Sequence, residues 1–321
     1  MNGFVSQCCE RLFDEKDIRL LPVKNQKFQD FYAPAVKTKA IWRLLVGLTV
    51  LIVVYLGFSV LFGVVVVLVA GAERGSEVLF AIKQGTDPKA VILLLTTFGA
   101  MFVGVVLAVK LVHKRGLKSL MGPNKNEAMR NFMIAFVIIV FLILVSIPFY
   151  VFTDLPVQNM AFSTWLSWML LGAPLLLLQV SSEELVFRGY IQQQLAARFD
   201  SRWAWYVLPS VLFGMLHYDP ETLGSNVWII VAHTTLFGLI AADVTARTGN
   251  LGAAIGLHFA NNLYALAIVS LDGSLSGLGL YKTPFHVSDE VAIRDVVVPQ
   301  LLFVLLLYGL FLWWCRNRPQ L

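Results

Sequence analysis

Charged residues are scarce in this chain of 321 residues, where Asp, Glu, Lys and Arg together make up 14%. A soluble domain carries roughly a quarter of such residues, so the composition excludes a soluble protein. Hydrophobic residues make up 58% of the chain and the mean hydropathy is +0.73, which predicts a polytopic membrane protein. The net charge of +5 requires no nucleic-acid partner, because membrane proteins carry excess Lys and Arg on cytoplasmic loops.

Cysteines and a secretory signal are also lacking. The three cysteines, Cys8, Cys9 and Cys315, form no disulfide framework, and all three are expected on the reducing cytoplasmic side. The first forty residues mix charged residues with scattered apolar ones, which is not the pattern of a signal peptide. Apolar residues at helical spacing between Phe4 and Phe13 predict either a helix on the membrane surface or a short cytoplasmic helix packed on the bundle.

Apolar runs are abundant, and eight of them predict membrane-spanning helices. A helix needs about 20 apolar residues to cross the hydrocarbon core; the fifth run is short by that measure and the fourth is long. The runs are approximately Leu44 to Ala70, Ala90 to Val112, Phe132 to Phe152, Trp165 to Tyr190, Ala204 to His217, Val227 to Asp243, Leu251 to Leu271 and Val296 to Trp314.

The charges between these runs alternate along the chain. Lys and Arg gather before the first run, between the second and third, and after the fourth, sixth and eighth. Asp154 is the only charge between the third and fourth runs, and Asp219 and Glu221 are the only ones between the fifth and sixth. Because cytoplasmic loops are enriched in Lys and Arg, this pattern predicts an all-α bundle of eight transmembrane helices with both termini in the cytoplasm.

Polar residues interrupt three of the apolar runs. Charged side chains at membrane depth cost several kcal/mol or more and usually mark function. A single buried Glu or His is equally well explained by an interhelical hydrogen bond, but several together are not. The residues in question are Glu183, Glu184, Arg188, His217, His258 and Asn262.

Their spacing predicts that they meet. Glu183 precedes Asp200 by 17 residues and His217 follows it by 17. If the chain turns near Asp200, both lie about 25 Å from the turn, at the same depth. Glu184 and Arg188 are four residues apart, as are His258 and Asn262, so each pair shares a helix face.

These residue types are those of a hydrolase without a covalent nucleophile. A buried glutamate is a suitable general base for a water molecule, and a histidine beside it can share that water. A second histidine and an amide can donate hydrogen bonds to the oxyanion of a tetrahedral intermediate. The remaining histidines are read as structural: His233 as an interhelical hydrogen-bond partner, and His113 and His286 as solvated residues near the ends of runs.

Three motifs resemble those of one family, the CPBP intramembrane proteases, which include type II CAAX prenyl proteases and the bacteriocin-processing and abortive-infection (Abi) proteins. The first is Glu-Glu-Leu-Val-Phe-Arg-Gly at Glu183–Gly189, and the second is Phe-Gly-Met-Leu-His at Phe213–His217. The third is His-Phe-Ala-Asn-Asn at His258–Asn262. The resemblance extends from Trp165 to about Leu271.

The resemblance implies an endopeptidase that works within the membrane. Glu183 would activate the water with His217, His258 with Asn262 would form the oxyanion site, and Glu184 with Arg188 would hold the constellation in place. No cofactor is favoured. Glu183, His217 and His258 could form a zinc site, but a metal-free site is preferred because the chain has no His-Glu-x-x-His motif.

The predicted organisation has four parts: a cytoplasmic segment at 1–40, three transmembrane helices at 41–160, a catalytic four-helix core at 161–275, and an extracytoplasmic loop with the last transmembrane helix at 276–321. The expected partners are the lipid bilayer and a membrane-anchored protein or peptide substrate, such as a C-terminally prenylated CAAX protein. Two alternatives remain: a proton-coupled transporter, since buried acids and histidines also build proton relays, and a non-catalytic immunity or scaffold protein of the same fold.

Overall fold

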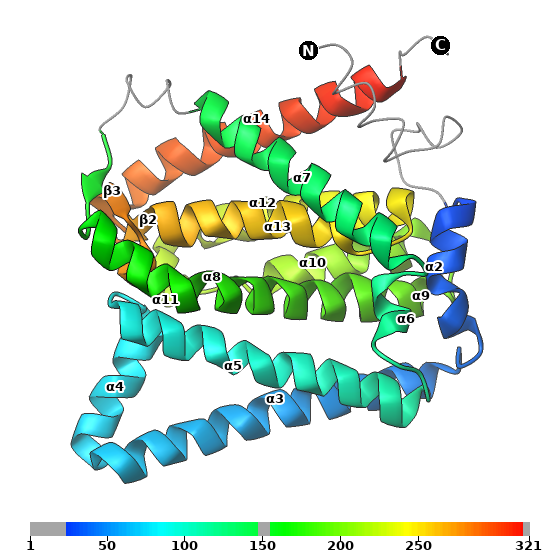
Figure 1. Ribbon diagram of the computed structural model, residues 1–321, viewed down its shortest axis with the longest axis horizontal. Coiled ribbons are helices and arrows are strands. Elements are labelled where there is room, and N and C mark those ends of the chain that lie inside the picture. The colour runs from blue at the N-terminus through cyan, green and yellow to red at the C-terminus, as the bar shows by residue number, and fades with distance from the viewer. Residues whose placement is uncertain (1–23, 147–154, 317–321) are drawn as a thin grey trace.

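The computed structural model describes residues 24–146 and 155–316 (Figure 1). The helix expected between Phe4 and Phe13 lies outside these residues, as do Cys8 and Cys9. Within the same N-terminal segment, helix α2 (Gln26–Val36) begins after Asn25, whose side chain accepts a hydrogen bond from the Phe28 amide. Helix α2 packs on the bundle through Phe28 and Phe31, which are fully buried.

The protein is mostly helical, and five helices among the described residues are long and apolar enough to cross a membrane. They coincide with the first, second, third, fourth and sixth predicted runs, and they make this a multi-pass membrane protein. The fifth run forms a shorter apolar helix at Trp203–Met215. The full count of eight stays a prediction. The five helices span Ile41–Ala70, Pro88–Val112, Lys125–Val145, Phe162–Ala196 and Pro220–Thr248.

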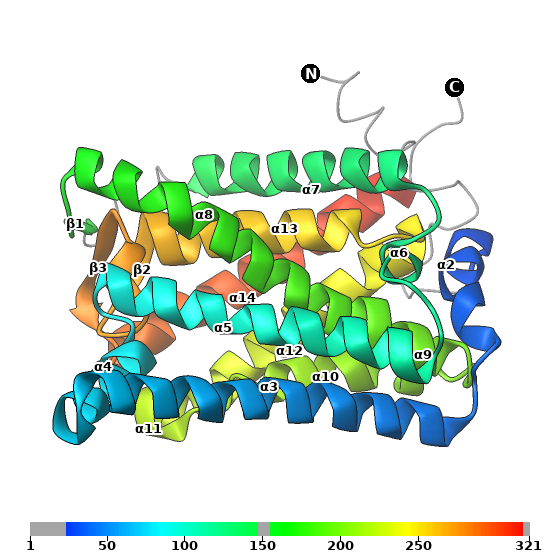
Figure 2. The same cartoon turned by 60° about the horizontal axis from the view of Figure 1, so that its bottom comes forward.

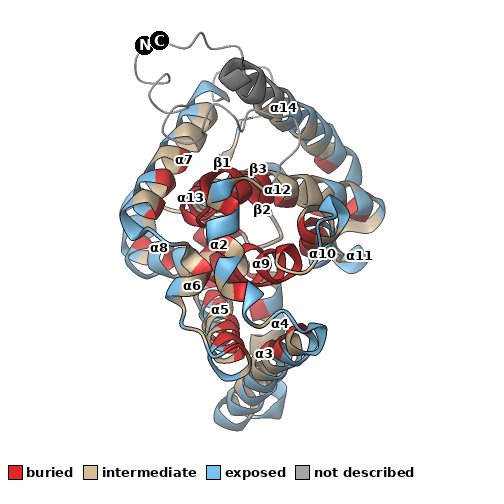
Figure 3. Ribbon diagram, turned by 90° about the vertical axis from the view of Figure 1, so that its right-hand side faces the viewer, coloured by how far each residue is buried: buried red, intermediate tan, exposed pale blue. Residues whose placement is uncertain are grey.

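Four helices form the centre of the bundle (Figure 1). They are α8 (Phe162–Glu184), α10 (Leu208–Met215), α12 (Val227–Thr248) and α13 (Gly252–Leu263). On one side lie α3 (Ile41–Ala70), α4 (Ala72–Gln84) and α5 (Pro88–Leu107), and on the other lie α7 (Lys125–Ser146) and α14 (Glu290–Arg316) (Figures 1 and 2). Buried residues concentrate on the central helices, whereas α3 and α7 present broad exposed faces, as expected of surfaces that contact lipid (Figure 3).

Several helices contain or adjoin a π-helical segment. α8 continues into a π-helix, η4 (Leu185–Gln192), and then into α9 (Gln193–Ala196). Further π-helical turns are η2 (Ala108–Val112), η5 (Trp203–Val207) and η7 (Tyr264–Ile268). Such turns are rare and frequently lie at functional sites. The short elements α6, α11, η6 and η8 connect the bundle at Lys118–Met121, Pro220–Leu223, Gly224–Asn226 and Ser276–Leu278.

A small sheet departs from the expected all-α fold. β1 (Val157–Gln158) pairs antiparallel with β3 (Tyr281–His286), which pairs in parallel with β2 (Val269–Asp272). The seventh apolar run therefore ends in a strand rather than continuing as helix to Leu271. The sequence did not reveal this, because a short apolar stretch fits a strand and a helix equally well.

The sheet fixes how α8 and α13 sit relative to each other. Trp165, near the start of α8, donates its indole N–H to the carbonyl oxygen of Ala267 at 2.7 Å. Asn159, which precedes α8, donates to the carbonyl oxygens of Ser276 and Gly279 at 3.1 and 2.9 Å. These bonds join the start of α8 to the chain that leaves α13, so the two helices run side by side from a fixed end.

Close packing of α13 on α7 completes this framework. Gly252 and Gly256, four residues apart on α13, face the backbone of α7. A Cβ atom at Gly252 would collide with the carbonyl oxygen of Ala128, and one at Gly256 with that of Phe132. Small residues at this spacing let membrane helices approach closely and gain van der Waals contact. The approach sets the position of His258, half a turn beyond Gly256.

We expect Gly256→Ala to lower the thermal unfolding midpoint of the purified protein in detergent. The added methyl group must displace the α7 backbone, and overpacking of this kind costs about 1–3 kcal/mol. Gly99→Ala is the matched control, because a Cβ at Gly99 meets nothing within 4 Å and alanine is the better helix former. Equal midpoints for the two variants would contradict the close-packing interpretation.

Candidate active site

The carboxylates of the first motif lie where α8 passes into the π-helix η4. Glu183 and Glu184 are the last residues of α8, and all eight residues of η4 are buried. The two side chains differ in their surroundings, since the Glu184 side chain is 0% exposed and that of Glu183 is 12% exposed. One glutamate is therefore locked in the protein interior, and the other borders accessible space.

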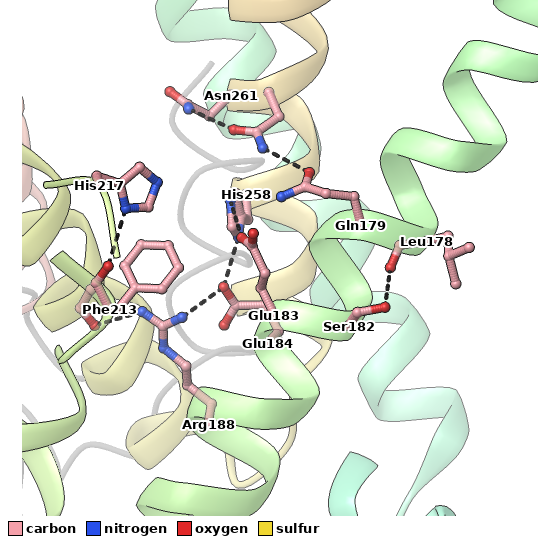
Figure 4. Close-up of polar contacts among 12 residues, drawn as sticks. Leu178, Gln179, Ser182, Glu183, Glu184, Arg188, Phe213, His217, His258 and Asn261 are labelled. Atoms are coloured by element: carbon pink, nitrogen blue, oxygen red, sulfur yellow. Dashed lines mark hydrogen bonds and ion pairs between the residues drawn. The ribbon is translucent and has the colours of Figure 1, made fainter. Parts of the chain in front are cut away.

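Glu184 is held by two partners. The guanidinium of Arg188 donates from Nη1 to Glu184 Oε1 at 2.9 Å, and Nδ1 of His258 lies 2.8 Å from the same oxygen (Figure 4). The pairing of Glu184 with Arg188, expected from their spacing, is confirmed. The contact with His258 was not expected, because the resemblance had paired His258 with Asn262 instead. It ties α13 directly to α8.

His258 lies between the two carboxylates. Its Nε2 is 3.7 Å from Oε2 of Glu183, on the side of the ring opposite Glu184. Because Glu184 already accepts from Arg188, it acts as an acceptor, and Nδ1 of His258 must carry the hydrogen between them. In the neutral ring, Nε2 is then left with a lone pair directed toward Glu183.

Arg188 joins these groups to α12 and α10. Its Nη2 donates to the carbonyl oxygen of Gly238 at 3.1 Å, and its guanidinium lies 4.7 Å from the centre of the Phe213 ring. That aromatic ring also contacts the rings of His217 and His258, with centroids 5.2 and 5.9 Å away. Phe213, the aromatic residue of the second motif, thus separates the two histidines and shields the cation.

His217 does not join Glu183 as expected. It follows the end of α10 and is exposed, and its Nδ1 donates to the carbonyl oxygen of Phe213 at 3.1 Å. No hydrogen bond or ion pair joins His217 to Glu183 in the described residues, and Figure 4 shows the His217 ring hydrogen-bonded to Phe213 instead. The turn near Asp200 was correctly predicted, but α10 ends before His217, so equal residue counts did not bring the side chains together. His233, predicted to form an interhelical hydrogen bond, makes no hydrogen bond to another described residue.

Asn262 is the middle member of a chain of three amides and does not pair with His258. Asn261 donates to Oδ1 of Asn262 at 3.2 Å, and Nδ2 of Asn262 donates to Oε1 of Gln179 at 3.0 Å. Because the oxygen of Gln179 is used, its amide nitrogen faces away from Asn262. In Figure 4 the Gln179 side chain points toward His258. Nε2 of Gln179 has no hydrogen-bond partner among the described residues.

The sequence interpretation missed Gln179, although a signal was present. It is a buried amide in the apolar run that precedes the first motif, four residues before Glu183. That spacing places the two side chains on one helix face. Phe237 belongs to a Phe-Gly-Leu run that also resembles the family but was not among the predicted site residues; its ring lies 4.8 Å from that of His258 and closes the apolar side of the site.

The zinc alternative does not fit this arrangement. Among the residues that the structure describes, no group of three His, Cys, Asp or Glu side chains is placed to hold a metal ion. Of the three proposed ligands, Glu183 and His258 face each other, but His217 is turned to the Phe213 carbonyl. We therefore derive no step through a metal.

The fold and the site together define a class: a multi-pass membrane protein with a histidine held between two carboxylates inside its helical bundle. Comparison with known proteins gives the family. Residues 162–264 match the family described as type II CAAX prenyl endopeptidase Rce1-like, and this part of the chain is a domain of that family. The resemblance seen in the three motifs is thereby confirmed, and all six predicted site residues lie within the match.

A further relative is an uncharacterized protein, YyaK, of Bacillus subtilis (strain 168). It is 28% identical over 263 residues, which cover 77% of this chain and 84% of that protein. The similarity therefore reaches beyond the matched domain. No solved structure matches the chain.

We expect Arg188→Gln to destabilise the protein by about 3–5 kcal/mol, because it leaves the Glu184 carboxylate buried without its cation. The double variant Arg188→Gln/Glu184→Gln should lose less, since no uncompensated charge remains. Thermal unfolding in detergent measures both. Lys83→Gln serves as control, because the Lys83–Glu221 pair is exposed and such pairs contribute little. A double variant less stable than the single one would count against the pairing.

Proposed function

We propose that this protein is an intramembrane endopeptidase that hydrolyses a peptide bond of a membrane-associated substrate with a water molecule activated by Glu183. The observation that carries the proposal is the position of His258, bonded to the buried Glu184 on one side and facing the accessible Glu183 on the other. The family of the matched domain supports peptidase chemistry.

The division between the two glutamates suits acid–base catalysis. Glu184 is neutralised by Arg188 and acts through His258, whose ring it orients. No Lys or Arg among the described residues pairs with Glu183, so its carboxylate is available as a base. A water oxygen can lie within hydrogen-bond distance of both Glu183 Oε2 and His258 Nε2, because those atoms are only 3.7 Å apart.

In the proposed reaction Glu183 carries out both proton transfers. Glu183 accepts a proton from the water while the water oxygen forms a bond to the peptide carbonyl carbon. The carbonyl oxygen becomes an oxyanion. Glu183 next gives its proton to the peptide nitrogen, the C–N bond breaks, and the products are a carboxylic acid and an amine. His258 orients the water, and Arg188 keeps Glu184 in place.

The amide of Gln179 is the donor best placed for the oxyanion. The resemblance assigned this role to His258 and Asn262, but Nδ1 of His258 is engaged by Glu184 and Asn262 donates to Gln179. Asn262 thus acts through Gln179 as a positioning residue. The free N–H group of Gln179 lies on the same helix face as Glu183, one turn away, where an oxyanion formed beside the attacked carbon can reach it.

The name of the family points to a substrate class, proteins that end in a prenylated CAAX sequence. Such a substrate would present its prenyl chain to the bilayer and its last residues to the bundle. Cleavage after the prenylated cysteine would release the three terminal residues.

We expect Glu183→Gln to reduce kcat by about 10²–10⁴, because the general base is lost. The thermal midpoint should barely change, since the Glu183 side chain has no hydrogen bond to another described residue. The assay uses purified protein in nanodiscs with a farnesylated CAAX peptide and the same peptide without the farnesyl group. Glu73→Gln, an exposed glutamate on α4, is the matched control. Retained activity in the Glu183 variant would refute the mechanism, and equal cleavage of both peptides would refute the prenyl substrate.

We expect Gln179→Glu to lower kcat by about 10²–10³ or more with little change in KM, because it removes an oxyanion donor and also places a carboxylate beside the oxyanion. The carboxylate can still accept from Asn262, so the change removes the donor while keeping the amide chain. If Asn262 acts through Gln179, Asn262→Leu should lower kcat in the native protein but should lower it little further in the Gln179 variant. Additive effects of the two substitutions on kcat would contradict this relationship.

A further inference from the structure

A cluster of arginines lies at the end of the bundle away from the sheet, where α2, α6 and α9 come together (Figures 1 and 2). It consists of Arg43 in the first turn of α3, Arg115 between η2 and α6, and Arg198 after α9. None of the three forms an ion pair with an acidic side chain in the described residues. Arginines that are partly withdrawn from water normally find such a partner.

Arg115 has one edge of its guanidinium free. Its Nη1 donates to Oε1 of Gln193 at 2.8 Å, which fixes the group in place. Its Nε and Nη2 are buried and have no hydrogen-bond partner in the described part of the chain. These two nitrogens form the edge with which arginine binds a carboxylate or phosphate through two parallel hydrogen bonds. These two unsatisfied nitrogens have the geometry that pairs with an oxyanion.

Arg198, the second arginine of the cluster, bonds to α9 and to the segment between α2 and α3. Its Nη1 donates to Gln194 and its Nη2 to the carbonyl oxygens of Thr38 and Ala40, so it holds the link between α2 and α3 against α9. Its Nε is buried without a partner. Arg115 and Arg198 bond to the adjacent residues Gln193 and Gln194, so the two cations lie near each other. Burial, with a smaller contribution from the charge of Arg198, lowers the pKa of Arg115.

His113 also lies in this cluster, and the positive charges of the arginines act on it. His113, expected to be solvated, is instead buried, with Nδ1 against the Thr38 hydroxyl at 3.0 Å and Nε2 against the Tyr190 hydroxyl at 2.9 Å. Burial, with the charges of Arg115, Arg198 and Arg43, lowers its pKa to about 4. His113 is therefore neutral at physiological pH and adds no charge to the cluster.

The neighbouring acids do not supply that counter-ion. The Asp200 carboxylate pairs with Lys24 at 2.9 Å on the surface. The groups that contact the arginines are amides, backbone carbonyls and an aromatic ring, all of them uncharged. Because these arginines are partly buried and no described acidic side chain pairs with them, a ligand that brings negative charge would stabilise them.

We propose that Arg115 and Arg198 bind the phosphate group of an anionic membrane lipid. A membrane source is favoured because Ile41 and Trp42, next to Arg43, are exposed apolar residues, and tryptophan is typical of the membrane interface. Exposed lysines at positions 37, 39, 110 and 114 surround the cluster, and basic residues at this level attract anionic headgroups. The site is separate from Glu183 and does not depend on the peptidase proposal.

The test uses the full-length protein purified in a neutral detergent. Its thermal midpoint is followed while short-chain phosphatidic acid, short-chain phosphatidylcholine or inorganic phosphate is titrated. We expect a saturable rise in the midpoint with phosphatidic acid and none with phosphatidylcholine. Arg115→Gln should weaken that effect about tenfold or more, since it removes two charge-assisted hydrogen bonds. Arg74→Gln, an exposed arginine on α4, should leave it unchanged.

Arg115→Lys covers the case in which Arg115→Gln fails to fold, because it keeps the charge and loses only the paired edge; it should also weaken binding. An equal response to inorganic phosphate would overturn the lipid assignment and leave a free-anion site. No saturable response, or the same response in Arg115→Gln as in the native protein, would overturn the proposal.

Discussion

The structure depends on the compensation of one buried charge, the Glu184 carboxylate. A charge in the interior of a membrane protein is tolerated only when its partners are in place. Here the partners come from two different parts of the chain, Arg188 one turn along the same helix and His258 on α13. Satisfying one oxygen atom therefore fixes the rotation of α8 and the depth of α13 at once. Glu183, the adjacent residue, is carried by that constraint to the accessible side of the His258 ring, and the proposed chemistry follows from its position.

Close backbone approach makes this compensation geometrically possible. Arg188 reaches the carbonyl of Gly238 on α12, and a Cβ at Gly238 would lie only 3.1 Å from the backbone of Ser210 on α10. Gly256 plays the same part where α13 meets α7. Because these positions lack side chains, neighbouring helices come near enough for Arg188 on one helix to bond to the backbone of another. The same closeness excludes water, which strengthens the electrostatic interactions within the site. The glycines and the charged residues are thus parts of one arrangement.

The sequence predicted those features that depend on local spacing. Five long apolar runs became helices of the expected kind, and Glu184 paired with Arg188 because residues four apart on a helix must face each other. The sequence could not predict which faces of different helices meet. His258 was expected to act with Asn262 on its own helix, yet its partner is Glu184, and Asn262 bonds to Gln179. Equal distances from a turn failed for His217, because the argument assumes that the helix continues to that residue. Periodicity gives a direction around a helix, whereas contacts between helices depend on tilt and on where each helix ends.

The two polar centres of the molecule illustrate how depth determines charge balance. Around Glu184 the protein supplies both signs of charge itself, as it must where lipid surrounds the bundle and no counter-ion can enter. Among the described residues no acidic side chain pairs with Arg115 or Arg198, and this centre lies at the end of the bundle beside loops and an exposed tryptophan. At that level anionic headgroups are present at high local concentration, so a ligand can complete the balance at little cost. An unpaired arginine edge that would be prohibitive beside Glu184 is therefore tolerable there, and the position of each centre agrees with the source of its negative charge.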